Sequence, residues 1–406
     1  MLSLTKLLCG DTYYGDTLRY APGSHGSLVG ARRDTGPVVV WNCTRACNLR
    51  CAHCYAAADA RAAAELDTAE ARALIDDLAS FRVPVLLLSG GEPLLRPDFF
   101  DLVGHAVNRG LRVVLSTNGT LIDREVAGTL KRLGVSYVGI SIDGIGDRHD
   151  RLRGCPGAFD AALEAVRRCR AAGLRVGLRL TLSSRNRDQL PAVLDLIEEE
   201  GIDRACFYHL VYSGRGRELI EQDLSPEEKR QTLERLISRV YSWQRLGRRI
   251  EVLTVDNHAD GPFVYLYLKK RRPERAAAAL ELLRRNGGNR SGIAIAAVDW
   301  EGKIHPDQFT LHHTVGEVRR EPFSRVWTQA RHPLLAALRR RKELLKGRCR
   351  RCRWLALCNG NCRARAEALT GDFWEADPAC YLEDGETLGP DQGRSEPEEA
   401  APYSSA

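Results

Sequence analysis

The sequence predicts an α/β protein made of repeated parallel βα units, and two observations support this fold class. From residue 36 to residue 200, short apolar runs typical of buried strands alternate with longer stretches of helical periodicity. Polar and glycine-rich segments follow the apolar runs, at the strand ends where parallel α/β folds carry their chemistry. At 406 residues, the chain is long enough for two or three domains with a sizeable core.

The predicted elements alternate along the first half of the chain. A strand at Gly36–Trp41 leads directly into a cysteine-rich loop. Asp67 and Glu70 form a capping-box pattern, which predicts a helix that ends near Phe81. Further strands are expected at Val85–Leu88, Val113–Thr117, Tyr137–Ile142, Arg175–Leu182 and Ala205–Val211, and helices near 97–109, 123–133, 158–172 and 187–200.

The pattern changes in the second half. A charged helix is predicted over 225–247, where it would cover the side of the sheet. The polar stretch Asp256–Gly261 either binds a substrate or is an ordinary loop rich in Asx turns. Gly292–Val298 and Lys303–Pro306 suggest a hairpin that turns at Glu301 and Gly302.

Composition favours an enzyme of a reducing compartment, and we expect a cytoplasmic location. The chain has 13 cysteines but no signal-peptide pattern in residues 1–30, which favours metal binding over disulfides. No apolar run approaches the roughly 20 residues that cross a bilayer, so no membrane association is expected. The formal charge of +7 could suit a polyanionic substrate or nucleic acid, but a solvated arginine-rich surface explains it equally well.

Three cysteines after the first strand form the central motif of the sequence. Cys47, Cys51 and Cys54 have C-x3-C-x2-C spacing, and an aromatic residue follows the last thiol. Three thiolates can hold three irons of a [4Fe–4S] cluster and leave the fourth iron free for another ligand. Structural zinc would need a fourth ligand, and a disulfide framework suits small secreted chains. Cys43 also lies four residues before Cys47, but it is more consistent with a small buried side chain.

This motif resembles that of the radical S-adenosylmethionine superfamily. The resemblance implies a partial (β/α)6 TIM-like barrel, and it implies that S-adenosylmethionine chelates the free iron. Gly90, Gly91 and Glu92 match the family's GGEP motif, which contacts the methionine amino group.

Two further strand ends resemble family segments that contact the cofactor. Thr117 and Ser141 have hydroxyls suited to ribose or carboxylate oxygens, although turn formation and helix capping would also explain these segments. Arg179 could pair with the methionine carboxylate or form an ion pair in the barrel wall.

A second cysteine group lies near the C-terminus. So many thiols close together in a reducing compartment indicate a metal site, which could hold either an iron–sulfur cluster or zinc. The region resembles the SPASM/twitch extension of the superfamily, which implies an auxiliary [4Fe–4S] cluster. Five cysteines compete for four places, and Asp307 stands where two-cluster versions of the extension have a further cysteine. We therefore expect one auxiliary cluster with Cys362 as the spare thiol and with these ligands: Cys349, Cys352, Cys358 and Cys380.

Segments across the chain resemble the NirJ family, which comprises the radical enzymes of haem d1 biosynthesis. These segments include Gly36–Asn42, Phe81–Leu86 and Leu357–Asn361. The resemblance implies an iron tetrapyrrole substrate, a didecarboxysirohaem, that loses two propionates as oxo groups are installed at C3 and C8. It also implies a reducing electron donor of the flavodoxin or ferredoxin class.

Three alternatives remain open at this stage. One is a related radical enzyme of the sirohaem-dependent haem pathway, and another is a SPASM-type peptide maturase. A non-catalytic or nucleic-acid-binding iron–sulfur protein would not need the strand-end motifs, so no nucleic-acid partner is expected.

The predicted organisation has five parts. They are an N-terminal segment (1–30), the partial barrel (31–225), a helical linker region (226–290), the auxiliary-cluster domain (291–382) and a disordered acidic tail (383–406).

Overall fold

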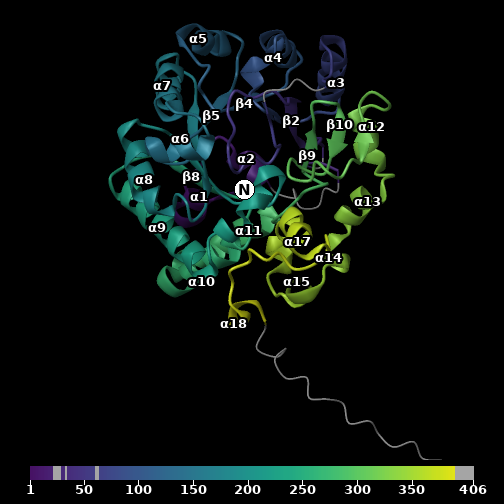
Figure 1. Ribbon diagram of the computed structural model, residues 1–406. Helices are drawn as coiled ribbons and strands as arrows, with labels where there is room; N and C mark the ends of the chain where they lie inside the picture. Colours follow the sequence, from purple (N-terminus) through teal and green to yellow (C-terminus); the bar gives the residue numbers. More distant parts are fainter. Residues whose placement is uncertain (22–28, 33, 60–63, 389–406) are drawn as a thin grey trace, which may run out of the picture.

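The computed structural model describes residues 1–21, 29–32, 34–59 and 64–388, and in this part of the chain a single mixed sheet organises the fold (Figure 1). Its eleven strands have the order β1-β8-β7-β6-β5-β4-β3-β2-β9-β10-β11. The strands are β1 (Leu2–Ser3), β2 (Val38–Thr44), β3 (Leu86–Gly90), β4 (Val113–Thr117), β5 (Tyr137–Ser141), β6 (Val176–Leu182), β7 (Arg204–His209), β8 (Glu251–Val255), β9 (Ile295–Val298), β10 (Lys303–His305) and β11 (Gly316–Glu317).

Helices connect the strands. They are α1 (Leu4–Cys9), α2 (Asp16–Arg19), α3 (Thr68–Ser80), α4 (Phe99–Asn108), α5 (Arg124–Arg132), α6 (Asp147–Arg153), α7 (Ala158–Ala171), α8 (Leu190–Glu199), α9 (Pro226–Arg245), α10 (Asp260–Arg271), α11 (Pro273–Asn286), α12 (Phe323–Gln329), α13 (Pro333–Arg339), α14 (Arg341–Leu344), α15 (Gly347–Arg351), α16 (Leu355–Cys358), α17 (Arg363–Thr370) and α18 (Asp384–Thr387). Short 3-10 helices lie at Pro93–Leu95, Arg187–Gln189 and Gly214–Gln222.

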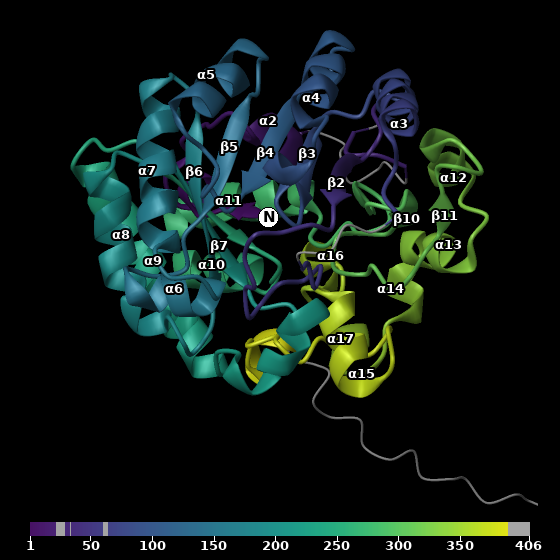
Figure 2. The ribbon, with the colours of Figure 1, turned by 45° about the horizontal axis from the view of Figure 1, so that its top comes forward.

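The six predicted βα units are confirmed. Strands β2 to β7 are neighbours in chain order and pair in parallel, with Trp41 opposite Leu88 and Leu88 opposite Leu115. Helices α3, α4, α5, α7 and α8 form the connections and lie along one face of the curved sheet (Figure 2). The predicted hairpin is also confirmed, because β9 and β10 pair antiparallel with Ile304 opposite Val298.

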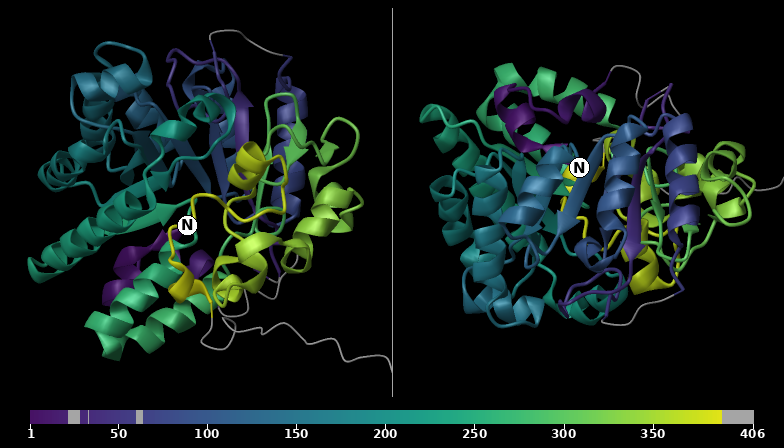
Figure 3. Two further views of the ribbon diagram at one scale, coloured as in Figure 1. Left: turned by 60° about the horizontal axis from the view of Figure 1, so that its bottom comes forward. Right: turned by 90° about the horizontal axis from the view of Figure 1, so that it is seen from above.

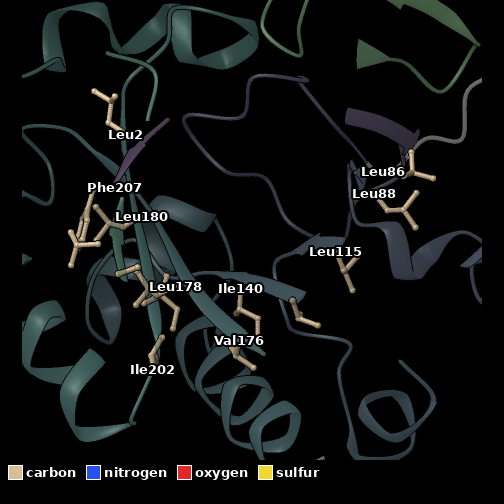
Figure 4. Packing of buried hydrophobic residues seen from close by; sticks show 14 of the residues in the cluster. Leu2, Leu86, Leu88, Leu115, Ile140, Val176, Leu178, Leu180, Ile202 and Phe207 are labelled. Carbon is tan, nitrogen blue, oxygen red and sulfur yellow. The ribbon is translucent and has the colours of Figure 1, made fainter. Parts of the chain in front are cut away.

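The two faces of the parallel strands differ in burial. Side chains on the helix-covered face, such as Leu86, Leu115 and Ile140, are at most 1% exposed and pack together (Figure 4). The neighbouring positions Ser141 and Arg179 belong to the opposite face and are only partly buried. Much of the inner face is buried as well, for example at Val114 and Cys206, so Ser141 and Arg179 are among its more exposed positions.

The parallel sheet is larger than six strands. Strand β8 extends it beside β7, and β9 extends it beside β2, in both cases in the parallel sense. The segment 226–290 was expected to be a helical linker, but its strand β8 is a full member of the sheet. A strand pairs wherever it meets an open edge, so the pairing of β8 was not visible from the local sequence pattern.

The N-terminal residues belong to the same folded body. Strand β1 pairs with β8, and helix α1 packs against α9, α10 and α11. Glu251 at the start of β8 forms ion pairs with Arg19 of α2 and with Arg204 of β7. These ion pairs connect α2 to the amino ends of β7 and β8.

The C-terminal region covers the opposite end of the strands. Figure 3 shows the C-terminal helices beside the sheet. Ala364 of α17 packs with Val211, two residues after β7, and Arg365 donates to the Leu210 carbonyl at 3.1 Å. The tail departs from the expected disorder, because α18 is helical and its Glu386 pairs with Arg230. Residues 389–406 lie outside the described residues. Within the described ranges, no helix has the length and apolar character needed to span a membrane.

Candidate active site

The three cysteines that follow β2 lie together in one loop. The pKa of the Cys47 thiol is raised to about 12, chiefly by burial and then by the proximity of Cys51 and Cys54. Burial also raises the pKa of Cys51. Buried thiols of this kind stay protonated until a metal stabilises the thiolates, so the loop offers three convergent sulfur ligands. Cys43 is different: it is 1% exposed and packs in the hydrophobic core, as expected.

Segments distant in sequence hold this loop in place. The backbone N–H groups of Arg50 and Ala52 donate to the carbonyls of Arg153 and Leu152, at 3.1 Å and 2.9 Å. Arg215 donates to the carbonyl of Cys51 at 2.8 Å. The conformation of the cysteine loop therefore depends on the end of α6 and on the segment that follows β7.

Gly90 and Gly91 bring the end of β3 against the cysteine loop. A side chain at Gly91 would meet the carbonyl oxygen of Ala46 at 2.1 Å, and one at Gly90 would meet that of Thr44 at 2.3 Å. The N–H groups of Gly91 and Glu92 donate to these same two carbonyls, each at 2.8 Å. The close approach that only glycine permits is thus a backbone contact with the loop.

Glu92 is fully buried beside this contact. Its carboxylate accepts hydrogen bonds from the Thr117 hydroxyl and from the N–H of Asn118, both at 2.8 Å. Burial raises the pKa of Glu92 to about 7, although these hydrogen bonds lower it. Such a carboxyl can accept a hydrogen bond from an amino group and can take up a proton near neutral pH.

Thr117 is a structural neighbour of Glu92. Its hydroxyl donates to Glu92 and accepts from the N–H of Gly119 at 3.0 Å, and the residue is 3% exposed. Since both functions of the hydroxyl are in use, the structure places Thr117 where it orients Glu92. The expected contact with the cofactor stays a prediction.

Ser141 and Arg179 are neighbours across β5 and β6 on the inner face of the sheet. The Arg179 guanidinium lies 4.9 Å from the ring centroid of Tyr208. The interactions of the aromatic hydroxyls and of Cys206 with Arg179 raise its pKa against the effect of burial. No ion pair of Arg179 is found among the described residues. A partly exposed guanidinium without a carboxylate partner is suited to an anionic ligand.

A buried polar network beside the cysteine loop was not found from the sequence. Arg153 contacts the Cys51 sulfur at 3.6 Å and pairs with the Asp143 carboxylate at 2.5 Å. His53, which lies between Cys51 and Cys54, contacts the same carboxylate at 3.2 Å. Asp143 lies two residues after Ser141 in one of the strand-end segments, but nothing local to Arg153 indicates its partners.

Four of the five C-terminal cysteines converge. The thiol of Cys358 lies within electrostatic range of Cys380, Cys349 and Cys352, and these neighbours add to the effect of burial in raising its pKa well above the usual value. The positive charge of Arg348 lies near Cys349 and Cys352 and lowers the pKa of both thiols, against the effect of burial.

Cys362 has different neighbours. Its thiol lies near Arg365, Asp377 and Asp307, and its N–H donates to Asp377 at 2.9 Å. Asp307 is occupied within its own loop, where it accepts from the N–H of Phe309 at 2.9 Å. Four cysteines therefore lie together without Cys362, and the auxiliary cluster and its ligands stay a prediction.

Two buried histidines of the described residues form hydrogen bonds with carboxylates. His209 bonds to Asp260 at 3.1 Å and stacks on Tyr381. His305 is fully buried and contacts Asp299 and the carbonyl of His313. His258 is 8% exposed, and its Nδ1 has no hydrogen-bond partner among the described residues.

Comparison with known proteins gives a consistent result. The model of the radical SAM superfamily matches residues 41–197. The chain is 52% identical over 389 residues to the Fe-coproporphyrin III synthase of Methanosarcina barkeri, a match that covers 94% of this chain and 98% of that protein. It is 45% identical to the pre-heme d1 synthase of Dinoroseobacter shibae, with 88% and 89% of the two chains covered.

Solved structures show the same fold. The crystal structure of Streptococcus suis SuiB bound to the precursor peptide SuiA matches with a TM-score of 0.69 at 16% identity, over 88% of this chain and 77% of that one.

Proposed function

Because the chain belongs to the radical S-adenosylmethionine superfamily, we propose that it removes carboxyl-bearing side chains from an iron tetrapyrrole and forms Fe-coproporphyrin III. The observation that carries the enzymatic part is the meeting of the three-cysteine loop with the buried carboxyl of Glu92 at the end of β3. The substrate class rests on the high identity to the Fe-coproporphyrin III synthase over nearly the whole chain.

The residues present fit the cofactors of this family. Cys47, Cys51 and Cys54 would hold three irons of a [4Fe–4S] cluster and leave one iron for S-adenosylmethionine. When bound, the cluster supplies the electron that cleaves S-adenosylmethionine into methionine and the 5′-deoxyadenosyl radical. Glu92 would accept a hydrogen bond from the methionine amino group. The Thr117 hydroxyl, which donates to the Glu92 carboxylate, would hold that carboxylate in position.

The inner face of the sheet would receive the anionic groups. Arg179 and the adjacent Ser141 can bind the methionine carboxylate or a substrate carboxylate, since guanidinium matches that shape. The C-terminal region covers this end of the strands and would keep solvent away from the radical.

We further propose one auxiliary [4Fe–4S] cluster in the C-terminal region. Its ligands would be the four cysteines that converge around Cys358, and Cys362 would remain a free thiol. An electron donor of the flavodoxin or ferredoxin class would reduce the enzyme.

Haem d1 biosynthesis is the second candidate. The segments Gly36–Asn42, Phe81–Leu86 and Leu357–Asn361 resemble the NirJ family, and the chain is 45% identical to a pre-heme d1 synthase. The two candidates differ in the product. Fe-coproporphyrin III keeps its propionates and has no oxo group, whereas the haem d1 precursor has lost two propionates and carries oxo groups at C3 and C8.

Product analysis separates the two candidates. The reconstituted protein is incubated anaerobically with S-adenosylmethionine, a reductant and a didecarboxysirohaem-type substrate, and the tetrapyrrole is analysed by mass spectrometry. We expect 5′-deoxyadenosine together with a product whose mass matches Fe-coproporphyrin III. A dioxo product that lacks two propionates would favour the second candidate. An unchanged tetrapyrrole beside abundant 5′-deoxyadenosine would contradict the substrate class. The Cys47→Ala/Cys51→Ala/Cys54→Ala variant is the control and should form no 5′-deoxyadenosine.

A further inference from the structure

A cluster of two histidines and one glutamate lies outside the site described above. His312 and His313 lie in the loop between β10 and β11, and Glu367 lies on α17. One ligand atom from each of the three residues can be chosen so that all lie within 4.8 Å of one another. All three side chains are partly accessible, with exposed fractions of 44%, 29% and 20%.

Both imidazoles are directed at one carboxylate. The Nε2 atom of His312 lies 2.7 Å from Oε2 of Glu367, and the Nε2 atom of His313 lies 3.0 Å from the same oxygen and 2.8 Å from Oε1. The ring centroids are only 4.3 Å apart. As a pure hydrogen-bonding group, this arrangement requires a proton on both Nε2 atoms. Two neutral imidazoles in the Nε2–H tautomer supply both protons, whereas in the Nδ1–H tautomer both Nε2 lone pairs are free to bind a metal ion beside the carboxylate.

The same three residues can also bind a single divalent cation. Zinc takes imidazole nitrogen and carboxylate oxygen at about 2.0–2.2 Å, so its ligand atoms lie about 3.3 Å apart in a tetrahedron. Each Nε2 atom would have to move away from the carboxylate oxygen Oε2 by only about half an ångström. Other histidine–carboxylate contacts of the described chain, such as His105 with Asp76, bring together one imidazole and one carboxylate.

The backbone beneath the two histidines is fixed in advance. The buried His305 contacts the carbonyl of His313 at 3.0 Å, and the His313 ring packs edge-on against Phe373 at 5.4 Å. A site whose ligands are already oriented loses little conformational entropy when a metal binds.

We propose that His312, His313 and Glu367 bind a divalent transition-metal ion that joins the β10–β11 loop to α17. The two-histidine, one-carboxylate ligand set suits zinc or ferrous iron and leaves at least one coordination position open. The same loop carries Phe309, whose ring packs against Tyr55 at 5.5 Å, and Tyr55 directly follows Cys54. The ion therefore fastens the part of the C-terminal region that lies beside the cysteine loop.

Metal uptake tests the site independently of catalysis. Protein carrying its iron–sulfur clusters is incubated anaerobically with zinc chloride, desalted and analysed for zinc. We expect the wild type to retain about one zinc ion per chain and both His312→Ala/His313→Ala and Glu367→Gln to retain less than about a tenth of that. His105→Ala removes the histidine of the matched surface pair and should retain the wild-type amount.

Cobalt and hydrogen exchange complete the test. The absorption spectrum of the Co²⁺-loaded wild type should show the weak d–d bands expected for nitrogen and oxygen ligands. In a separate measurement, amide hydrogen exchange in residues 307–313 should slow when zinc is added. Strong thiolate charge-transfer bands, or zinc retention by the double variant equal to that of the wild type, would overturn the proposal. If the double variant does not fold, zinc retention by Glu367→Gln and the cobalt spectrum of the wild type test the proposal instead. A parallel incubation with ferrous iron shows which ion binds more tightly. Neither tetrapyrrole nor S-adenosylmethionine is present, so these results do not depend on the proposed function.

Discussion

At the scale of single residues, burial controls the behaviour of Glu92. Its carboxyl has no exposure to solvent, and its pKa is raised from 4.5 to about 7. Below pH 4.5 the group is protonated in both the folded and the unfolded chain, so the stability associated with the proton is fully present. As the pH rises to about 7, the unfolded chain releases the proton first and this stability is lost.

Glu92→Gln should remove this pH dependence. Relative to the variant, the wild type should lose on the order of 3 kcal/mol of unfolding free energy between about pH 4.5 and about pH 7. Urea unfolding of the cluster-free proteins across this range measures the difference. A difference in unfolding free energy that stays constant across this pH range would show that the pKa of Glu92 is not raised.

Arg153 is the second residue whose surroundings decide its role. It contacts the Cys51 sulfur and pairs with the buried Asp143, so it places a positive charge beside one of the proposed cluster ligands. Hydrogen bonds and positive charge near the sulfurs raise the potential of an iron–sulfur cluster.

Arg153→Gln should lower the midpoint potential of the cluster at Cys47, Cys51 and Cys54 and slow the cleavage of S-adenosylmethionine. It should also destabilise the fold by about 3–5 kcal/mol, because Asp143 loses its buried partner. A redox titration followed by electron paramagnetic resonance measures the potential. Arg151→Gln changes an exposed arginine of the same helix and should leave the potential unchanged. An unaltered potential in Arg153→Gln would rule out the electrostatic role.

At the scale of elements, the end of β3 and the cysteine loop form one unit. The contact depends on Gly90 and Gly91, where an added Cβ would overlap backbone oxygen. Overlap with a backbone atom cannot be relieved by turning a side chain, so one of the two segments has to move.

Gly91→Ala should therefore displace the cysteine loop from β3. We expect a loss of at least about 2 kcal/mol of stability and a marked loss of cluster iron in the reconstituted protein. Thermal unfolding and iron analysis measure the two effects. Gly385→Ala is the matched control, since a Cβ at Gly385 meets nothing within 4 Å. Full iron content in Gly91→Ala would mean that the contact does not position the loop.

At the scale of the whole molecule, the two cysteine groups belong to different parts of one body. The first follows β2, and the second lies in the C-terminal region that covers the carboxyl end of the strands. We propose that a cluster in the second group accepts an electron during conversion of the substrate.

Loss of the auxiliary cluster should separate the cleavage of S-adenosylmethionine from the conversion of the tetrapyrrole. A Cys380→Ala variant should lose the iron of that cluster and still cleave S-adenosylmethionine, but it should not complete conversion of the tetrapyrrole. Cys362→Ala should retain its iron, because the Cys362 thiol lies with Asp377 and Arg365. Iron analysis, 5′-deoxyadenosine yield and product mass measure these outcomes. Full conversion by Cys380→Ala would exclude an electron-transfer role, and equal iron loss in both variants would overturn the choice of ligand.

The sequence by itself determined the features that depend on short-range pattern. The spacing of Cys47, Cys51 and Cys54, the strand-end segments and the alternation of apolar runs are local, and they predicted six parallel βα units that the structure confirms. The second cysteine group was equally visible, since its members lie within about thirty residues.

Only the tertiary structure decided the remaining features, because they join residues far apart in the chain. The pairing of β8 and β9 with the parallel strands, the contact of Arg153 with Cys51 and the convergence of His312 and His313 on Glu367 leave no periodic signal in the sequence. The close backbone contact at Gly90 and Gly91 is of the same kind, since the glycines predict an approach but not its partner. A local pattern fixes which face of an element is apolar, whereas the choice among possible partners follows from how the chain packs as a whole.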